Sequence, residues 1–134
     1  MNTNVENKGQ LPDNVIALPT SLEDGNFFRL WVEFLKPLHH LTDREMDVIT
    51  AFLKKRYELS KSITDNTILD KYLVSEEIKR EIREDCNITL AHFQVVMGKL
   101  KKSGVFVDGN INPKFIPNLT MDKGNLQMLL YFTF

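Results

Sequence analysis

The clearest hydrophobic pattern lies in residues 75–102, where apolar side chains recur at helical spacing in two successive stretches. In the first stretch, Ile78 and Ile82 lie four residues apart behind Ser75, a favourable helix N-cap. In the second, apolar positions recur at steps of three and four residues behind Thr89, another N-cap residue. These positions are Phe93, Val96, Met97 and Leu100. The pattern predicts two helices, 75–86 and 89–102, joined by a tight turn.

A short β-hairpin is expected directly after the second helix. Gly104 favours the left-handed conformation that ends many helices, and the apolar residues 105–107 follow it as a strand. Asp108 and Gly109 form a typical hairpin turn, after which Ile111 begins the returning strand. Helix, turn, helix, glycine and hairpin is the order of a winged helix-turn-helix. We therefore predict a mainly α fold with a small β wing.

An N-terminal arm and an extra apolar helix are expected before this motif. Residues 1–14 are polar and show no periodicity, which is typical of an arm, and a short apolar patch, 15–19, follows them. The arm is therefore assigned to residues 1–25 and the domain to residues 26–134. Residues 27–36 are apolar nearly all round, which predicts a helix covered on more than one side and ended by Pro37. The helix either packs across the domain core or leaves one side for a partner. The candidate partner-binding residues are Phe27, Phe28 and Trp31.

Two more helices and a last strand complete the predicted elements. Thr42 and Glu45 form a capping box at the start of a long helix, and residues 62–74 contain a shorter one. Residues 126–134 have the alternation of a strand, with both faces largely apolar. We expect this strand to pair with residues 105–107, because a single short hairpin is not stable alone.

Charge limits the kind of partner that the domain can bind. The chain has 134 residues, with 17 basic and 18 acidic side chains and a net charge of −1, which argues against strong non-specific binding to polyanions. The charge is uneven, since residues 86–121 contain four lysines and one acid, Asp108, whereas residues 76–86 contain five acids and three basic residues. Any contact with DNA must therefore be small.

The sequence shows no catalytic constellation, and we expect no enzyme activity, cofactor, metal or small-molecule substrate. His39 and His40 are adjacent, so on a helix they point about 100° apart and cannot share a metal ion. His92 has no partner at ligand spacing, and Cys86 is the only cysteine, which excludes an internal disulfide. No secretory signal or membrane-spanning segment is visible, so no membrane contact is expected.

The second helix of the motif supplies the candidate nucleic-acid-binding residues. Its exposed side near the N-terminal end is expected to face the groove of duplex DNA, with lysines at its far end and beyond the hairpin on phosphates. The groove-facing candidates are Thr89, His92 and Gln94, and the phosphate-binding candidates are Lys99, Lys101, Lys102 and Lys114. A glutamine can bond adenine, but no arginine or asparagine accompanies it.

The same helix supports a different interpretation. Ala91, Val95 and Gly98 form a small, smooth stripe that is better suited to close packing than to contact with base edges. Other proteins or a second copy of this chain are then the expected partners. The choice between a DNA contact and a protein contact stays open at this level.

Four short motifs in this chain resemble a known group of proteins. They are Leu41-Thr-x-Arg-Glu, Lys79-Arg80-x-Ile82-Arg83, Leu100-Lys-Lys-x-Gly-Val and Ile111-Asn-Pro-Lys-x-Ile-Pro. On these motifs, most of residues 38–134 resembles small uncharacterised winged helix-turn-helix-like proteins of tailed phages that infect Bacteroidetes, including crAss-like phages. The resemblance implies a regulator, a packaging accessory or a structural protein of the virion, in the host cytoplasm or the phage particle.

Overall fold

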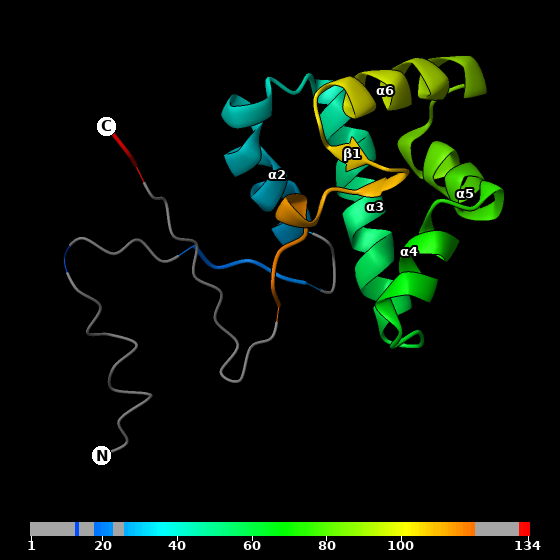
Figure 1. Cartoon of the computed structure of the whole chain (residues 1–134), viewed down its shortest axis with the longest axis horizontal. Helices are drawn as coiled ribbons and strands as arrows, with labels where there is room; N and C mark the ends of the chain where they lie inside the picture. The colour runs from blue at the N-terminus through cyan, green and yellow to red at the C-terminus, as the bar shows by residue number, and fades with distance from the viewer. Residues whose placement is uncertain (1–12, 14–17, 23–25, 120–131) are drawn as a thin grey trace.

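The computed structural model describes residues 13, 18–22, 26–119 and 132–134. The described chain is mainly α-helical, with one two-stranded antiparallel hairpin (Figure 1). Its elements are α2 (Asn26–His39), α3 (Asp43–Ser60), α4 (Asn66–Leu73), α5 (Glu76–Cys86), α6 (Leu90–Lys102), β1 (Phe106–Val107), β2 (Asn110–Ile111) and the 3-10 turn η1 (Pro113–Phe115). The long helix α3 lies in the centre and contacts α2, α4, α5 and α6.

Side-chain caps fix where four of the helices begin. The predicted capping box is present on α3, since the Thr42 hydroxyl accepts from the Glu45 N–H and the Glu45 carboxylate accepts from the Thr42 N–H. Asp65, Ser75 and Thr89 cap α4, α5 and α6 through side-chain oxygens that accept from backbone N–H groups of the first turn. Each cap satisfies backbone donors that have no partner within the helix. The two predicted helices of the motif are therefore confirmed, with their predicted caps.

The turn between α5 and α6 is tied to α3. Asn87 ends α5 in the left-handed conformation, at φ 54°, which asparagine tolerates better than most residues. The Arg44 guanidinium on α3 donates to the carbonyl oxygens of Cys86 and Asn87 at 3.1 and 3.2 Å. These carbonyls lie at a helix end and lack helical partners. Arg44 thus fixes how the second helix of the pair sits on the domain.

The hairpin forms at the predicted place. Phe106 pairs with Ile111 and Val107 with Asn110 in antiparallel register. Asp108 and Gly109 occupy the turn with φ values of 56° and 82°, the positive pair that a two-residue turn of the I′ type requires. Among the described residues, this sheet has two strands.

One face of every helix and the inner side of the hairpin pack together to form the core. Its fully buried large side chains include Phe28, Phe52, Phe115, Met46, Ile49, Leu53, Ile82 and Leu100. Phe27 and Phe28 are buried in it, and the Trp31 Nε1–H donates to the Phe115 carbonyl oxygen at 2.7 Å. The extra apolar helix thus packs on the domain's own core. Phe27 and Phe28 are not on an exposed face, and Trp31 is half-buried, which weighs against their assignment as partner-binding residues.

The end of α2 differs from the prediction. Pro37 does not end the helix, which continues to His39. A proline costs most in a helix interior, where it removes a hydrogen bond and crowds the preceding turn; here only two helical residues follow it. His40 has φ 52° and lies outside the helix, and the Leu41 N–H closes the turn on the Lys36 carbonyl oxygen. The helix therefore ends where the backbone becomes left-handed.

The predicted C-terminal strand lies mostly outside the described residues. Residues 132–134 are described, and they form no strand. Phe132 is 76% exposed and Phe134 is fully exposed. For these three residues the prediction of a strand that covers the core is wrong, and within the described chain β1 pairs with β2 alone. The polar arm, residues 1–25, also lies largely outside the described residues.

Candidate nucleic-acid interface

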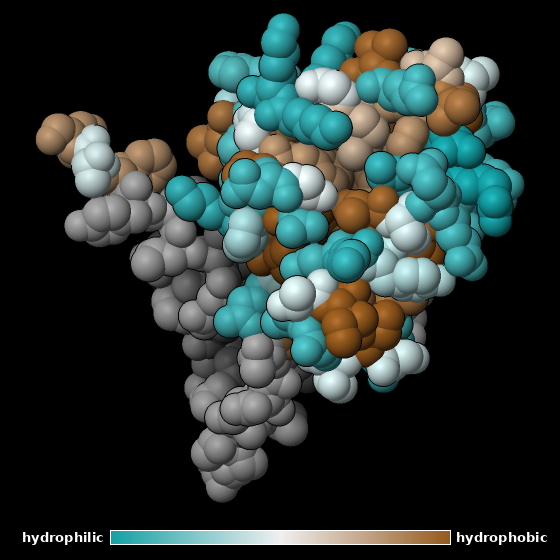
Figure 2. All heavy atoms as spheres, turned by 45° about the vertical axis from the view of Figure 1, so that its right-hand side comes forward, coloured by the Kyte–Doolittle hydropathy of each residue, from teal (hydrophilic) through white to brown (hydrophobic). Residues whose placement is uncertain are grey.

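Helix α6 crosses one end of α3, and one of its sides is free of the rest of the described chain (Figure 1). Its inner side carries the predicted apolar residues, all of which are buried. Thr89, His92 and Gln94 are exposed, as predicted. Figure 2 shows that the upper edge of the molecule, where α6 lies, carries both hydrophilic and hydrophobic side chains. The outer side of α6 is therefore a mixed surface.

The three groove-facing candidates differ in the hydrogen-bonding groups that their side chains have available for a ligand. The Thr89 hydroxyl oxygen accepts the His92 N–H at 3.1 Å, so Thr89 acts first as the cap of α6. Its hydroxyl proton remains available as a donor. His92 and Gln94 make no side-chain hydrogen bond with another described residue, which leaves an imidazole and an amide on the surface. Gln94 has both a donor and an acceptor for a base edge.

The lysines at the C-terminal end of α6 have no carboxylate partner within the described chain. Seven ion pairs form among the described residues, and none includes Lys99, Lys101 or Lys102. By contrast, the Arg29 guanidinium lies 2.6 Å from the Asp47 carboxylate, and the Arg56 guanidinium lies 3.0 Å from that of Asp70. These two arginines thus stabilise the fold, whereas Lys99, Lys101 and Lys102 are exposed and form no ion pair with another described residue.

Lys114 comes from a separate element that follows the hairpin. It is exposed on η1, and its backbone N–H donates to the Asn112 side chain at 3.0 Å. The Asn112 amide also donates to the Gly104 carbonyl oxygen at 2.9 Å, which fixes η1 against the end of α6. Asp108 lies at the hairpin turn, and its negative charge makes that tip unfavourable for phosphate. Lys114 is therefore the better phosphate candidate beyond α6.

Acidic side chains lie at the opposite end of the motif. Glu84 and Asp85 are exposed in the last turn of α5, shortly before α6 begins. The charge thus changes along the α5–α6 pair, from acidic before the N-terminal end of α6 to basic at its C-terminal end. Because negative side chains repel phosphate, the C-terminal end of α6 is electrostatically the more favourable end for an anion.

The structure brings two histidines to the lysines of α6. A hollow of about 420 Å³, here called the α2–α6 hollow, lies between the C-terminal ends of these helices. It is lined by Leu38, His39, His40, Glu45, Lys99, Lys102 and Ser103. Sequence reasoning considered the histidines only as metal ligands and missed this neighbourhood. No local signal was available, since His39 and Lys99 are far apart in the chain and meet only through the packing of α2 and α6.

The smooth stripe on α6 is also on the surface. Ala91, Val95 and Gly98 are exposed, and Val95 is 55% exposed. Leu90, which is 51% exposed, adds a larger apolar side chain near the start of the helix. A Cβ atom added to Gly98 would meet nothing within 4 Å. The fold of the described chain therefore does not require a glycine at this position.

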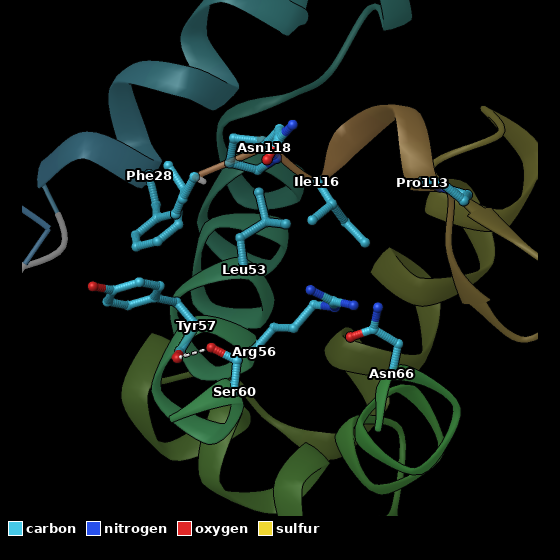
Figure 3. Close-up of a pocket in the computed structure, with 11 residues that line it drawn as sticks. Phe28, Leu53, Arg56, Tyr57, Ser60, Asn66, Pro113, Ile116 and Asn118 are labelled. Carbon is cyan, nitrogen blue, oxygen red and sulfur yellow. Dashed lines mark hydrogen bonds between the residues drawn. The ribbon is translucent and has the colours of Figure 1, made fainter. Parts of the chain in front are cut away.

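A second hollow, of about 570 Å³, lies between α3, the start of α4 and the segment after η1 (Figure 3). Apolar side chains such as Phe28, Leu53 and Ile116 form much of its wall. Its charged side chain, Arg56, bonds through Nε to the Asp70 carboxylate at 3.0 Å, so this cation already has a structural partner. Leu119, the last residue of the continuous described segment, also lines the hollow.

Metal-binding and membrane-spanning features are absent from the described residues. In the described segments, no group of three or more histidine, cysteine, aspartate or glutamate side chains is placed to hold a metal ion. None of the described helices has the length and apolar character needed to cross a membrane. No protein-family model, curated protein or solved structure matches this chain.

Proposed function

We propose that this chain is a non-enzymatic, phage-type winged helix-turn-helix protein that binds duplex DNA weakly, as a regulator or a packaging accessory. The observation that carries the proposal is the outer side of α6, where polar side chains are followed by three exposed lysines with no carboxylate partner in the described chain. Helix α5 precedes α6 and the hairpin follows it, which is the order of elements expected for the proposed motif. The host cytoplasm or the phage particle is the proposed location.

Helix α6 has suitable dimensions for this role. Its 13 residues make it about 20 Å long, and the major groove of B-DNA, about 12 Å wide, admits a single α-helix. Gln94 is assigned to an adenine edge, with His92 and Thr89 beside it. Lys99, Lys101 and Lys102 are assigned to phosphates, which contribute affinity without sequence information.

The net charge of −1 and the acids of α5 keep the expected affinity low. A direct test replaces Lys99, Lys101, Lys102 and Lys114 with alanine together. Each phosphate contact contributes about 0.9 to the magnitude of the slope of log Kobs against log salt, so loss of four contacts should reduce this magnitude by up to about 3.6. Fluorescence anisotropy with a labelled duplex over a salt series measures it.

The matched control for this test is Lys71→Ala. Lys71 is exposed in the last turn of α4, forms no ion pair with another described residue, and lies away from α6. The control should leave both the affinity and the salt slope unchanged. If the quadruple variant binds DNA at low salt as well as the unmodified protein does, the DNA proposal is wrong.

A second candidate function is a structural protein of a tailed-phage virion, with α6 as a protein-interaction surface. Gly98 supports it, because glycine in a helix costs about 1 kcal/mol relative to alanine and nothing in the described chain lies close enough to require it. Close approach of another helix along Ala91, Val95 and Gly98 explains the glycine. The proposed partner is another virion protein or a second copy of this chain.

Gly98→Leu tests this second function without DNA. The added Cβ atom meets nothing within 4 Å in the described chain, and Gly98 is exposed, so the fold should be retained and the melting temperature should not fall. If α6 packs closely against a protein, the variant should lose the assembly, as measured by sedimentation velocity and by its amount in purified particles. Assembly of Gly98→Leu at the unmodified level would reject the interaction surface.

A further inference from the structure

We propose that the α2–α6 hollow binds one phosphate of a DNA backbone, so that the extra helix α2 takes part in the nucleic-acid contact. This inference rests on the proposed binding of duplex DNA by α6, and it assigns a specific contact and two further residues to that interface. The hollow is open to the surface, and Lys99 and Lys102 at the basic end of α6 line it. A backbone that passes this end of the helix therefore passes the hollow.

The lysines provide the positive charge of the proposed phosphate site. Lys99 and Lys102 are three residues apart on α6, which places them on the same side of the helix, and both line the hollow. Neither forms an ion pair with another described residue. Two ammonium groups on one open, shallow surface suit a phosphate, because hydrogen bonds between ionised groups are the stronger ones.

His40 provides a further donor from the turn between α2 and α3. Its backbone is left-handed, at φ 52°, an uncommon conformation for a residue other than glycine. The residue is exposed and lines the hollow. An imidazole carries at least one N–H group in either charge state, so it can donate to a phosphate oxygen.

His39 has a different role, as a positioning residue. Its Nδ1 atom lies 3.4 Å from the Ser103 carbonyl oxygen, and its ring centroid lies 4.4 Å from that of Phe115. Because a carbonyl oxygen only accepts, Nδ1 must carry the proton in this contact. His39 thus joins the end of α2 to the end of α6, and this contact holds His40 beside the two lysines.

Glu45 is the acidic side chain among the residues that line the hollow, and its carboxylate is already engaged. It is only 5% exposed, and it accepts the Thr42 N–H at 3.2 Å within the capping box. It does not pair with either lysine. The exposed donors of the hollow therefore outnumber its one buried acid, which leaves the site favourable for an anion.

The test uses His40→Gly, alone and combined with Lys102→Ala. Glycine adopts positive φ without strain, so the variant should fold and melt at or above the temperature of the unmodified protein. Loss of one hydrogen bond to a charged group should weaken binding to a labelled duplex by about tenfold. If both side chains contact the same phosphate, the loss in the double variant should be smaller than the product of the two single losses.

Other outcomes separate this inference from the proposed function. If His40→Gly binds DNA normally while the quadruple lysine variant does not, the phosphate site in the hollow is rejected and the role of α6 stands. If the losses of His40→Gly and Lys102→Ala multiply fully, the two residues do not share a phosphate and the site is also rejected. If the unmodified protein does not bind the duplex at low salt, the proposed function itself fails.

Discussion

Cys86 illustrates how the environment of one residue changes its chemistry. Its thiol is half-buried at the end of α5, and it donates to the Asp47 carbonyl oxygen at 3.6 Å. Burial, together with the nearby Asp47 carboxylate, raises the pKa of the Cys86 thiol from 9.0 to about 11. The thiolate is the nucleophile, so the folded protein should be much less reactive than a free thiol.

We expect Cys86 to react with a disulfide reagent about 100-fold more slowly at pH 8 in the folded protein than in the denatured one, since the pKa rises by about two units. The rate of colour release by Ellman's reagent, with and without denaturant, measures this ratio. Equal rates of colour release in the folded and the denatured protein would contradict the raised pKa of the Cys86 thiol.

The raised pKa also makes stability depend on pH. Between pH 9 and pH 11 the folded state retains a proton that the unfolded state loses, so the contribution of Cys86 to stability falls as the pH rises through this window.

The structural roles of single residues could be predicted from the sequence where they depend on nearby backbone groups. Ser75, Thr89 and the Thr42–Glu45 box act on backbone groups within three residues, so the sequence alone identified these caps. Pro37 misled the prediction, because the cost of a proline depends on how much helix follows it. That length was set by the left-handed residue His40, for which histidine gives little sequence signal.

At the scale of elements, the pair α5–α6 and its hairpin followed from periodicity and turn residues. The orientation of this helix pair on the domain could not be predicted in the same way. It depends on Arg44, which crosses from α3 to the carbonyl oxygens of Cys86 and Asn87. Contacts between residues more than forty positions apart leave no periodic pattern in a sequence.

For the extra helix α2, too, the sequence predicted the helix but not what it packs against. Its apolar composition allowed two interpretations, a core helix or a surface that awaits a partner. The bond from Trp31 to the Phe115 carbonyl oxygen and the burial of Phe28 place the helix against the core. The packing that buries one side of α2 also carries His40 to Lys99 and Lys102. The sequence therefore could not predict that these residues lie together around the α2–α6 hollow, because only the packing of α2 and α6 brings them together.

At the scale of the whole molecule, the arrangement of charge separates structural cations from available ones. Arg29 of α2 binds the Asp47 carboxylate on α3, and Arg56 of α3 binds the Asp70 carboxylate on α4, so both ion pairs join elements. The unpaired lysines of α6 lie at one end of the molecule, next to the end of α2. A protein with almost no net charge can thus retain a small basic surface, as weak, salt-sensitive DNA binding requires.

The last prediction concerns removal of residues 132–134. A strand buried on the core would make this truncation costly, because a fully buried phenylalanine contributes roughly 1.5–3 kcal/mol. Phe132 and Phe134 are instead exposed, so the melting temperature should change by less than about 1 °C. Phe115→Ala is the matched control, since Phe115 is fully buried and its truncation should cost about 3–5 kcal/mol. Differential scanning calorimetry measures both variants. A fall of several degrees in the truncated protein would show that these aromatic residues cover apolar surface, in the same molecule or in a neighbouring copy.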